Sequence, residues 1–195
     1  TLALDDVRHP AQRTRQHLRR RVDHALAAGL DRVAHVRPAE PRVHHLAGPS
    51  DSEPALVRIA TWQRVMDEAG LVAPPLWQGD WSARSGYQLG QHLAADPTLT
   101  AVYCANDEMS FGLIRALHEH GLRVPQDVSV VGFDDIALSG YSSPPLTTVK
   151  QDFHRIGHEL VRLVLEQLKS RGRAQQRVSI PTELIVRQTT APPGR

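Results

Sequence analysis

The stretch LTAVYCANDEMSFGLIRALHEHGLRVPQDVSVVGFDDI, residues 99–136, decides the fold. Its two continuous apolar runs, Leu99–Cys104 and Val128–Phe133, are typical of strands that are buried on both faces of a parallel sheet. Between them, residues 107–120 carry apolar side chains at helical spacing, and Gly121 ends the pattern. The side chains expected to point inward are Met109, Leu113, Ala116 and Leu117. A strand, a helix and a second strand in this order predict a βαβ unit.

The same alternation extends from this unit in both directions. Upstream, the expected elements are a strand at Val43–Ala47, a helix from Pro54 that stops at Gly70, a short strand at Leu76–Gln78 and a helix from Ser82 to about Ala95. Downstream, they are a helix that includes Ile156 to Leu168, with Asp152 as its N-cap, and strand-like residues at Val178–Ile185 that Pro181 interrupts. The sequence therefore predicts an α/β fold with a mostly parallel sheet flanked by helices.

The composition fits a folded chain of one generous domain or two small lobes. The 195 residues are 41% hydrophobic, which excludes a wholly disordered chain, and no apolar run is long enough to cross a membrane. The single cysteine, Cys104, cannot form an internal disulfide and favours a cytoplasmic location. Residues 1–42 hold nine Arg against five acidic residues, whereas residues 43–195 hold 14 basic against 16 acidic residues. The body of the chain is therefore a poor nucleic-acid surface.

Polar loops follow four of the predicted strands. They are Gly48-Pro49-Ser50, Gly79-Asp80-Trp81, Asn106-Asp107 and Asp134-Asp135. Arg58 is expected one turn into the first helix, on the face away from Trp62. Because the carboxyl ends of parallel strands share one edge of a sheet, these side chains are expected on one rim, where they suit a polyhydroxylated ligand. Taken singly, Asp107 is equally a helix N-terminal carboxylate, Trp81 a core aromatic and Asp135 a turn residue.

No catalytic constellation stands out. Asp134 and Asp135 are adjacent, so their carboxylates diverge, whereas paired acid/base carboxylates come from separate elements. The sequence has no phosphate-binding loop, no G-x-G-x-x-G and no G-x-S-x-G string. Three histidine strings lack the further ligands that a metal site needs: His44-His45, His118-Glu119-His120, and His158-Glu159 with Arg162 in place of a second histidine. The expectation is a protein that is not an enzyme, with no catalytic residue, metal or cofactor.

Several strings in the sequence are familiar in their order. They are VHHLAGP (43–49), GDWSARSGY (79–87), VYCANDEMSFGLIRALHEHGLRVPQDVSVVGFDDI (102–136), PPLTTVKQDF (144–153) and ELIVRQTT (183–190). Together they resemble the effector-binding domain of the LacI/GalR-family transcriptional regulators, over about residues 43–190. The resemblance implies a two-lobed, periplasmic-binding-protein-like fold. In it, residues 43–147 form the C-terminal lobe, 148–176 a crossing (Val149–Phe153) and an N-terminal-lobe helix, and 177–195 a returning strand and tail.

The resemblance also implies a binding site. In this family a small effector, usually a sugar or a nucleobase, lies in the cleft between the lobes, and closure of the lobes changes how a separate headpiece meets its operator DNA. The positions that match effector-binding residues of the family are Arg58, Trp81, Asn106, Asp134, Gln151 and Phe153. Asp107 and Asp135 are expected in supporting roles.

Residues 1–42 do not follow the family pattern. They form a divergent segment rich in Arg and His, and neither the headpiece nor most of the N-terminal lobe is matched there. The expected fold therefore has one complete lobe and an N-terminal lobe that is largely missing. A truncated or divergent gene and a stretch read in a shifted frame are two explanations, which the coding DNA would separate.

The predicted function is an effector-sensing module of a transcriptional regulator, with a sugar or a nucleobase-like effector. Operator DNA would be reached only through a headpiece that this chain does not contain. A homodimer is expected through the segments around Leu113 and Leu138–Tyr141, and the helix from residue 154 is expected to expose an apolar stripe. Two alternatives remain open: a solute-binding protein of transport type, and a degenerate remnant that binds nothing.

Overall fold

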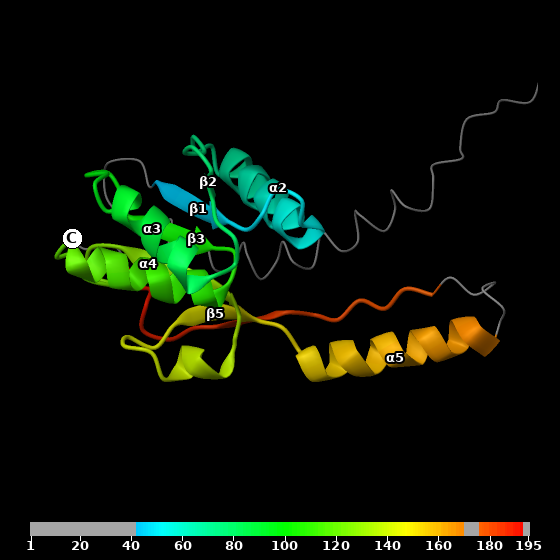
Figure 1. Cartoon of the computed structure of the whole chain (residues 1–195). Coiled ribbons are helices and arrows are strands. Elements are labelled where there is room, and N and C mark those ends of the chain that lie inside the picture. Colours follow the sequence, from blue (N-terminus) through cyan, green and yellow to red (C-terminus); the bar gives the residue numbers. More distant parts are fainter. Residues whose placement is uncertain (1–41, 170–175, 193–195) are drawn as a thin grey trace, which may run out of the picture.

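Six strands form one sheet through the middle of the structure, a computed structural model that describes residues 42–169 and 176–192 (Figure 1). The strands are β1 (Val43–Ala47), β2 (Trp77–Gln78), β3 (Ala101–Cys104), β4 (Ser129–Asp134), β5 (Thr147–Lys150) and β6 (Glu183–Ile185). Their order across the sheet is β2-β1-β3-β4-β5-β6. All neighbouring pairs are parallel except β5 and β6, which are antiparallel. The predicted α/β class with a mostly parallel sheet is confirmed.

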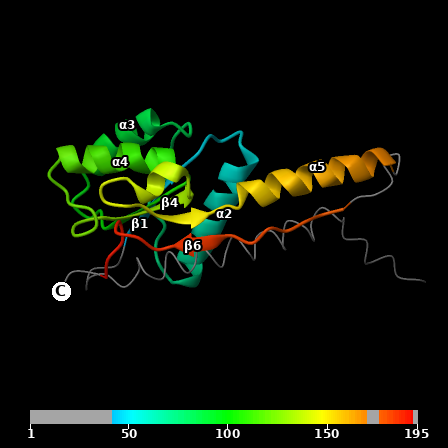
Figure 2. The same cartoon turned by 90° about the horizontal axis from the view of Figure 1, so that it is seen from below.

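Helices cover both faces of the sheet. The covering helices are α2 (Glu53–Glu68), α3 (Ala83–Leu93) and α4 (Asp107–Glu119). The structure also has α5 (Phe153–Lys169), which extends beyond the sheet (Figure 1), and the short 3₁₀ helix η1 (Ala137–Gly140). Helices α3 and α4 lie together on one face, and α2 lies on the other (Figure 2). The predicted stops are confirmed after α2 and α4, where Gly70 and Gly121 adopt φ values of 68° and 75° that favour glycine.

The core is divided between the two faces of the sheet. Under α2, the side chains of Trp62, Met66, Tyr103 and Phe133 pack together. Under α3 and α4 the core includes Met109, Leu113, Ala116 and Leu117, and all four inward residues predicted for α4 are fully buried. A Cβ at Gly86 or Gly112 would collide with the backbone of the facing helix, so α3 and α4 approach closely because both positions are glycine.

Cys104 is an inert member of the core. Its side chain is completely buried in β3, and burial raises the pKa of its thiol to about 12. A protonated, inaccessible thiol is a poor nucleophile and a poor metal ligand.

The end of the described chain is built into the sheet. Thr189 is completely buried; its hydroxyl accepts a hydrogen bond from the Thr147 N–H at 2.8 Å and donates one to the Val130 carbonyl at 2.6 Å. Its own carbonyl accepts from the Val130 N–H at 2.8 Å. Residues from three distant parts of the sequence are thereby joined at one point.

The strand-like residues expected at Val178–Ile185, with an interruption at Pro181, form a strand only after that proline. Only Glu183–Ile185 pairs with the sheet, because Pro181 has no backbone N–H to donate, and residues 176–182 run back from the far end of α5 toward the sheet (Figure 1). The expected crossing also contains regular structure, since Val149 and Lys150 belong to β5.

Helix α5 projects away from the sheet in both views (Figures 1 and 2). The predicted N-cap is confirmed, because the Asp152 carboxylate accepts a hydrogen bond from the Arg155 N–H at 2.9 Å. None of the residues of α5 is buried. Its exposed apolar side chains are Phe153, Leu160, Val161, Val164, Leu165 and Leu168, which confirms the predicted exposed stripe. Within the described ranges, no helix is long and apolar enough to span a membrane.

Candidate functional site

The candidate site lies at the carboxyl edge of the sheet, where the polar loops were expected. Asn106 lies two residues past the end of β3, Asp134 is the last residue of β4, and Gln151 directly follows β5. Because these three strands are parallel neighbours, their carboxyl ends bring the three side chains to the same edge. Arg58 reaches this edge from the first half of α2.

Arg58 lies on the buried face of α2, so the prediction that it points away from Trp62 is wrong. The two residues are four positions apart, and this spacing places them on the same side of a helix. Arg58 is only 8% exposed, and its guanidinium carbon is 3.9 Å from the centroid of the Phe133 ring and 5.5 Å from that of Trp81. A guanidinium can be buried there because it stacks on aromatic faces.

Asp134 connects Arg58 with Gln151. Its Oδ1 accepts a hydrogen bond from Gln151 Nε2 at 2.6 Å and lies 3.8 Å from Arg58 Nη2, close enough for an ion pair but too far for a hydrogen bond. Burial raises the pKa of the Asp134 carboxyl, while the Gln151 hydrogen bond and the Arg58 charge act in the opposite direction. Its φ of 114° is a conformation that L-residues rarely adopt, which is a feature of many binding sites.

Asn106 holds Trp81 in place. Its Nδ2 donates to the Trp81 carbonyl at 2.8 Å, and its Oδ1 accepts from the Met109 N–H at 3.0 Å as the N-cap of α4. Trp81 has a φ of 74°, and a Cβ at Gly48 would collide with its indole ring. The loop after β1 is therefore shaped to receive the ring, and both polar ends of the Asn106 amide already have protein partners.

Asp107 and Asp135 make contacts within the fold. Asp107 is completely buried, and its carboxylate accepts hydrogen bonds from the Ile136 N–H at 3.0 Å, the Ser139 hydroxyl at 2.6 Å and the Thr148 hydroxyl at 2.5 Å. Burial raises the pKa of Asp107, while these donors lower it. Asp135 pairs with Arg187 Nη2 at 2.7 Å. These contacts fasten the loop that carries Asp134 to α4, β5 and the segment after β6.

Phe153 is not brought into this group. It is the first residue of α5, its side chain is 53% exposed, and its backbone N–H donates to the Gln151 carbonyl at 3.1 Å. The other five predicted residues are linked to one another by the contacts described above. Phe133, which packs against the guanidinium, was missed as a site residue, although its position next to Asp134 at the end of an apolar strand was visible in the sequence.

The side chains around Arg58 offer hydrogen-bond donors, a carboxylate acceptor and apolar ring faces, a set that suits the binding of a small polar ligand. Among the residues that the structure describes, Arg58 has no hydrogen-bond acceptor, so its N–H donors remain for a ligand. The Asp134 carboxylate can accept hydroxyl hydrogens, and the Trp81 and Phe133 rings supply apolar faces. No group of three or more metal-ligating side chains occurs within residues 42–169 and 176–192.

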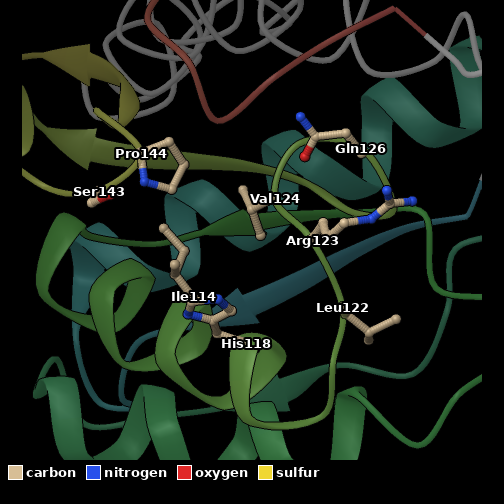
Figure 3. A pocket seen from close by; sticks show the side chains of 8 residues that line it. All are labelled: Ile114, His118, Leu122, Arg123, Val124, Gln126, Ser143 and Pro144. Atoms are coloured by element: carbon tan, nitrogen blue, oxygen red, sulfur yellow. The ribbon is translucent and has the colours of Figure 1, made fainter.

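A separate pocket of about 260 Å³ lies between the end of α4 and the loop before β5 (Figure 3). It is lined by Ile114, His118, Leu122, Arg123, Val124, Gln126, Ser143 and Pro144. None of the predicted effector-binding residues contributes to it, so this pocket is distinct from the candidate site.

The sequence matches the family model described as a periplasmic binding protein-like domain over residues 22–190. The transcriptional repressor PurR of Haemophilus influenzae (strain PittEE) is 34% identical over 174 residues, which cover 86% of this chain and 52% of that protein. The lactose operon repressor of Escherichia coli (strain K12) is 37% identical over 174 residues, which cover 89% of this chain and 45% of that protein. The chain therefore spans about half the length of the curated relatives it matches.

The fold agrees with these sequence matches. The structure of the lac repressor dimer bound to operator and the anti-inducer ONPF superposes with a TM-score of 0.78 at 35% identity, covering 86% of this chain and 58% of that chain. The family match, the superposition and the order of the strands and loops lead to one conclusion. The chain belongs to the periplasmic-binding-protein-like family, among the effector-binding domains of LacI/GalR-type transcriptional regulators.

Proposed function

We propose that this chain senses a small polyhydroxylated effector, a sugar, at the Arg58–Asp134 site and does no chemistry on it. The observation that carries the proposal is the Arg58 guanidinium between Phe133 and Trp81, 3.8 Å from Asp134 and without a hydrogen-bond acceptor among the described residues. A sugar offers hydroxyl oxygens to such a guanidinium, hydroxyl hydrogens to the carboxylate and an apolar face to the indole. A relative named for the lactose operon supports a sugar, and a nucleobase-like effector is the second candidate.

Each residue has a definite part in this proposal. Arg58 donates to the effector, Asp134 accepts from it, and Gln151 holds the carboxylate through its hydrogen bond of 2.6 Å. Trp81 covers one face of the ligand, and Asn106 fixes the backbone of Trp81. Phe153, at the start of α5, contacts the effector only if α5 changes its position relative to the sheet.

The proposed regulation is that of a cytoplasmic repressor. Effector binding would change the fit between a DNA-binding headpiece, which residues 42–169 and 176–192 do not contain, and its operator. The relatives are transcriptional repressors, which supports a regulator rather than an enzyme or a transport-type binding protein.

We also propose a homodimer through the surface around η1. Leu138 is 55% exposed and Tyr141 is 88% exposed there. Leu113, expected at this surface, is completely buried on the inner side of α4 and makes no direct contact in the proposed dimer. An exposed apolar surface of this kind is typical of a protein–protein contact.

The experiment is a thermal melt of the chain with mono- and disaccharides and, separately, with purine bases at millimolar concentration. A ligand present at 100 times its Kd stabilises the folded state by about 2.7 kcal/mol, which shifts the Tm by several degrees. Trp81→Ala should weaken the binding of any sugar found by about 1–3 kcal/mol, because the indole would no longer cover its apolar face. A shift with purines alone would replace the sugar by a nucleobase, and a cooperative melt with no shift for either class would favour a remnant that binds nothing.

A further inference from the structure

Two buried polar side chains lie under α2, on the face of the sheet where Arg58 stacks. Tyr103 packs in the same core cluster as Phe133, and the His45 ring centroid is 5.5 Å from that of Trp62. His45 in β1 and Tyr103 in β3 are paired across the two strands, and their rings stack with centroids 4.7 Å apart and planes 10° apart. They are 0% and 1% exposed, respectively. We call this pair the inner polar layer.

The hydrogen bonding of His45 defines its tautomer. Its Nδ1 is 2.9 Å from the Tyr103 carbonyl oxygen, which can only accept, so Nδ1 carries the hydrogen. Burial lowers the pKa of His45 to about 4, so the ring is neutral at physiological pH and its Nε2 is a bare acceptor. Neither this Nε2 nor the Tyr103 hydroxyl has a hydrogen-bond partner among the described residues.

Arg58 has N–H donors that lack an acceptor among the described residues. Its guanidinium stacks on Phe133 at 3.9 Å, but an aromatic face offers no acceptor to N–H groups that point in the guanidinium plane. The nearest carboxylate oxygen, Asp134 Oδ1, already accepts from Gln151 at 2.6 Å and is 3.8 Å from Arg58 Nη2. Burial raises the pKa of the Tyr103 hydroxyl and lowers that of His45; the Arg58 charge opposes the first shift and adds to the second, so the inner polar layer lies within electrostatic reach of the guanidinium.

We propose that His45 Nε2 and the Tyr103 hydroxyl hold the Arg58 guanidinium in its binding orientation through a bridging buried water. His45 and Tyr103 are thus positioning residues, and this role rests on the proposed effector site. Buried polar atoms without protein partners are costly unless water or a ligand satisfies them, and a water beneath Arg58 would satisfy a donor and two acceptors at once. The effector would then meet an arginine that is already oriented.

The test measures the exchange of the Arg58 Nε–H hydrogen with water by NMR, without any effector. The cross-peak is assigned by its loss in Arg58→Lys. Tyr103→Phe removes only the hydroxyl, whereas His45→Phe removes Nε2 together with the Nδ1–H that donates to the Tyr103 carbonyl; both keep an aromatic ring in the stack. We expect Arg58 exchange at least tenfold faster in both variants, or loss of the cross-peak.

His44→Phe is the matched control, because it makes the same change one residue earlier in β1. His44 is also buried, but its Nε2 lies 3.6 Å from Asp96 Oδ2, at a different place from the Tyr103 stack. Exchange in Tyr103→Phe and His45→Phe within twofold of the unmodified chain would overturn the proposal, as would equal acceleration in His44→Phe. Backbone amide spectra report folding, and Tyr103→Phe alone decides if His45→Phe does not fold.

The outcome is separate from that of the proposed function. If Arg58 Nε–H exchange is faster in Tyr103→Phe and His45→Phe but no sugar or purine raises the Tm, the effector proposal fails and the positioning role stands. If a sugar raises the Tm and the exchange rate of the Arg58 Nε–H hydrogen is unchanged in Tyr103→Phe and His45→Phe, only the positioning role fails.

Discussion

At the scale of single residues, the site depends on a charged side chain buried between aromatic rings. Arg58 is 8% exposed, yet its only ionic partner in the described structure is Asp134 at 3.8 Å. Stacking on Phe133 at 3.9 Å compensates part of the loss of hydration and leaves the N–H donors unoccupied. The N–H donors of Arg58 are therefore open to a ligand at the proposed site.

Replacing Asp134 with Asn should lower effector affinity at least tenfold with little change in stability. The loss follows from exchanging a charged acceptor for a neutral amide, since charge-assisted hydrogen bonds are about twice as strong. Stability should change by less than about 1 kcal/mol, because burial already disfavours the charge and Asn tolerates positive φ. Calorimetric titration with the ligand found by the melt and urea unfolding measure the two effects.

Asp67→Asn is the control for this change, because it removes an exposed charge at the other end of α2. It should alter neither quantity. Unchanged affinity in Asp134→Asn would remove that carboxylate from the site.

His45 should make the stability of the chain depend on pH. Its pKa is 6.5 when unfolded and about 4 when folded, so the unfolded chain binds the proton first as the pH falls. Stability is complete above pH 6.5, decreases between pH 6.5 and 4, and is flat below; the full effect is about 3 kcal/mol at 1.36 kcal/mol per unit.

Urea unfolding across this range, compared with His45→Phe, measures the contribution of that ring. Asp107 and Asp134, whose pKa values burial raises, act in the opposite direction from pH 3.8 upward in both proteins. They therefore cancel in the comparison. Parallel pH profiles for the two proteins would show that His45 is not the group that titrates.

At the scale of the elements, the boundaries that the sequence predicts best are those with local chemistry. The helix predicted from residue 107 begins there, behind Asn106 as its observed N-cap, and ends before Gly121 as expected; Leu113 is buried as its spacing predicts. The face of Arg58 was predicted wrongly, although its spacing of four residues from Trp62 places both side chains on one side of α2. The stacking of its guanidinium was not predictable from local pattern, because the Phe133 ring comes from a distant strand.

The site was likewise only partly visible in the sequence. The polar residues at the strand ends could be named because parallel strands end on one edge. The hydrogen bond between Gln151 and Asp134 depends on the pairing of β4 with β5, which no local pattern specifies. The inner polar layer was missed for the same reason, since His45 and Tyr103 are 58 residues apart.

The hydrogen bonds of the Thr189 hydroxyl connect the end of the described chain to β4 and β5, so their contribution to stability can be tested by removing that hydroxyl. Thr189→Val keeps the shape of the side chain but leaves the Thr147 N–H without its acceptor. Because that group is buried, we expect a loss of about 1–3 kcal/mol in the free energy of unfolding, measured in urea. Thr190→Val, at a half-buried neighbour, should cost less, and equal losses would contradict a special role for Thr189.

At the scale of the whole molecule, α5 is the feature that most affects behaviour in solution. Its stripe exposes Val161 to 62% and Leu168 to 72%. Contiguous exposed apolar surface of this kind favours association with other surfaces.

The double variant Val161→Lys, Leu168→Glu should therefore reduce self-association of the chain. Its stability should change by less than about 0.5 kcal/mol, because neither side chain is buried. Light scattering after size-exclusion chromatography measures the effect over a range of concentrations. Val72→Lys, at an isolated apolar residue that is 80% exposed, is the control and should leave the association unchanged. Equal association in the double variant would show that α5 is not the contact.

The position of Thr189 has a consequence for synthesis of the protein on the ribosome. The hydrogen bonds that join Thr189 to Val130 and Thr147, and the pairing of β6 with β5, come from residues translated after every other strand of the sheet. A chain released from the ribosome before residue 183 is added thus has an open edge at β5, which is a template for aggregation. Addition of β6 covers that edge of β5, so the sheet is complete only in copies that contain residues 183–189.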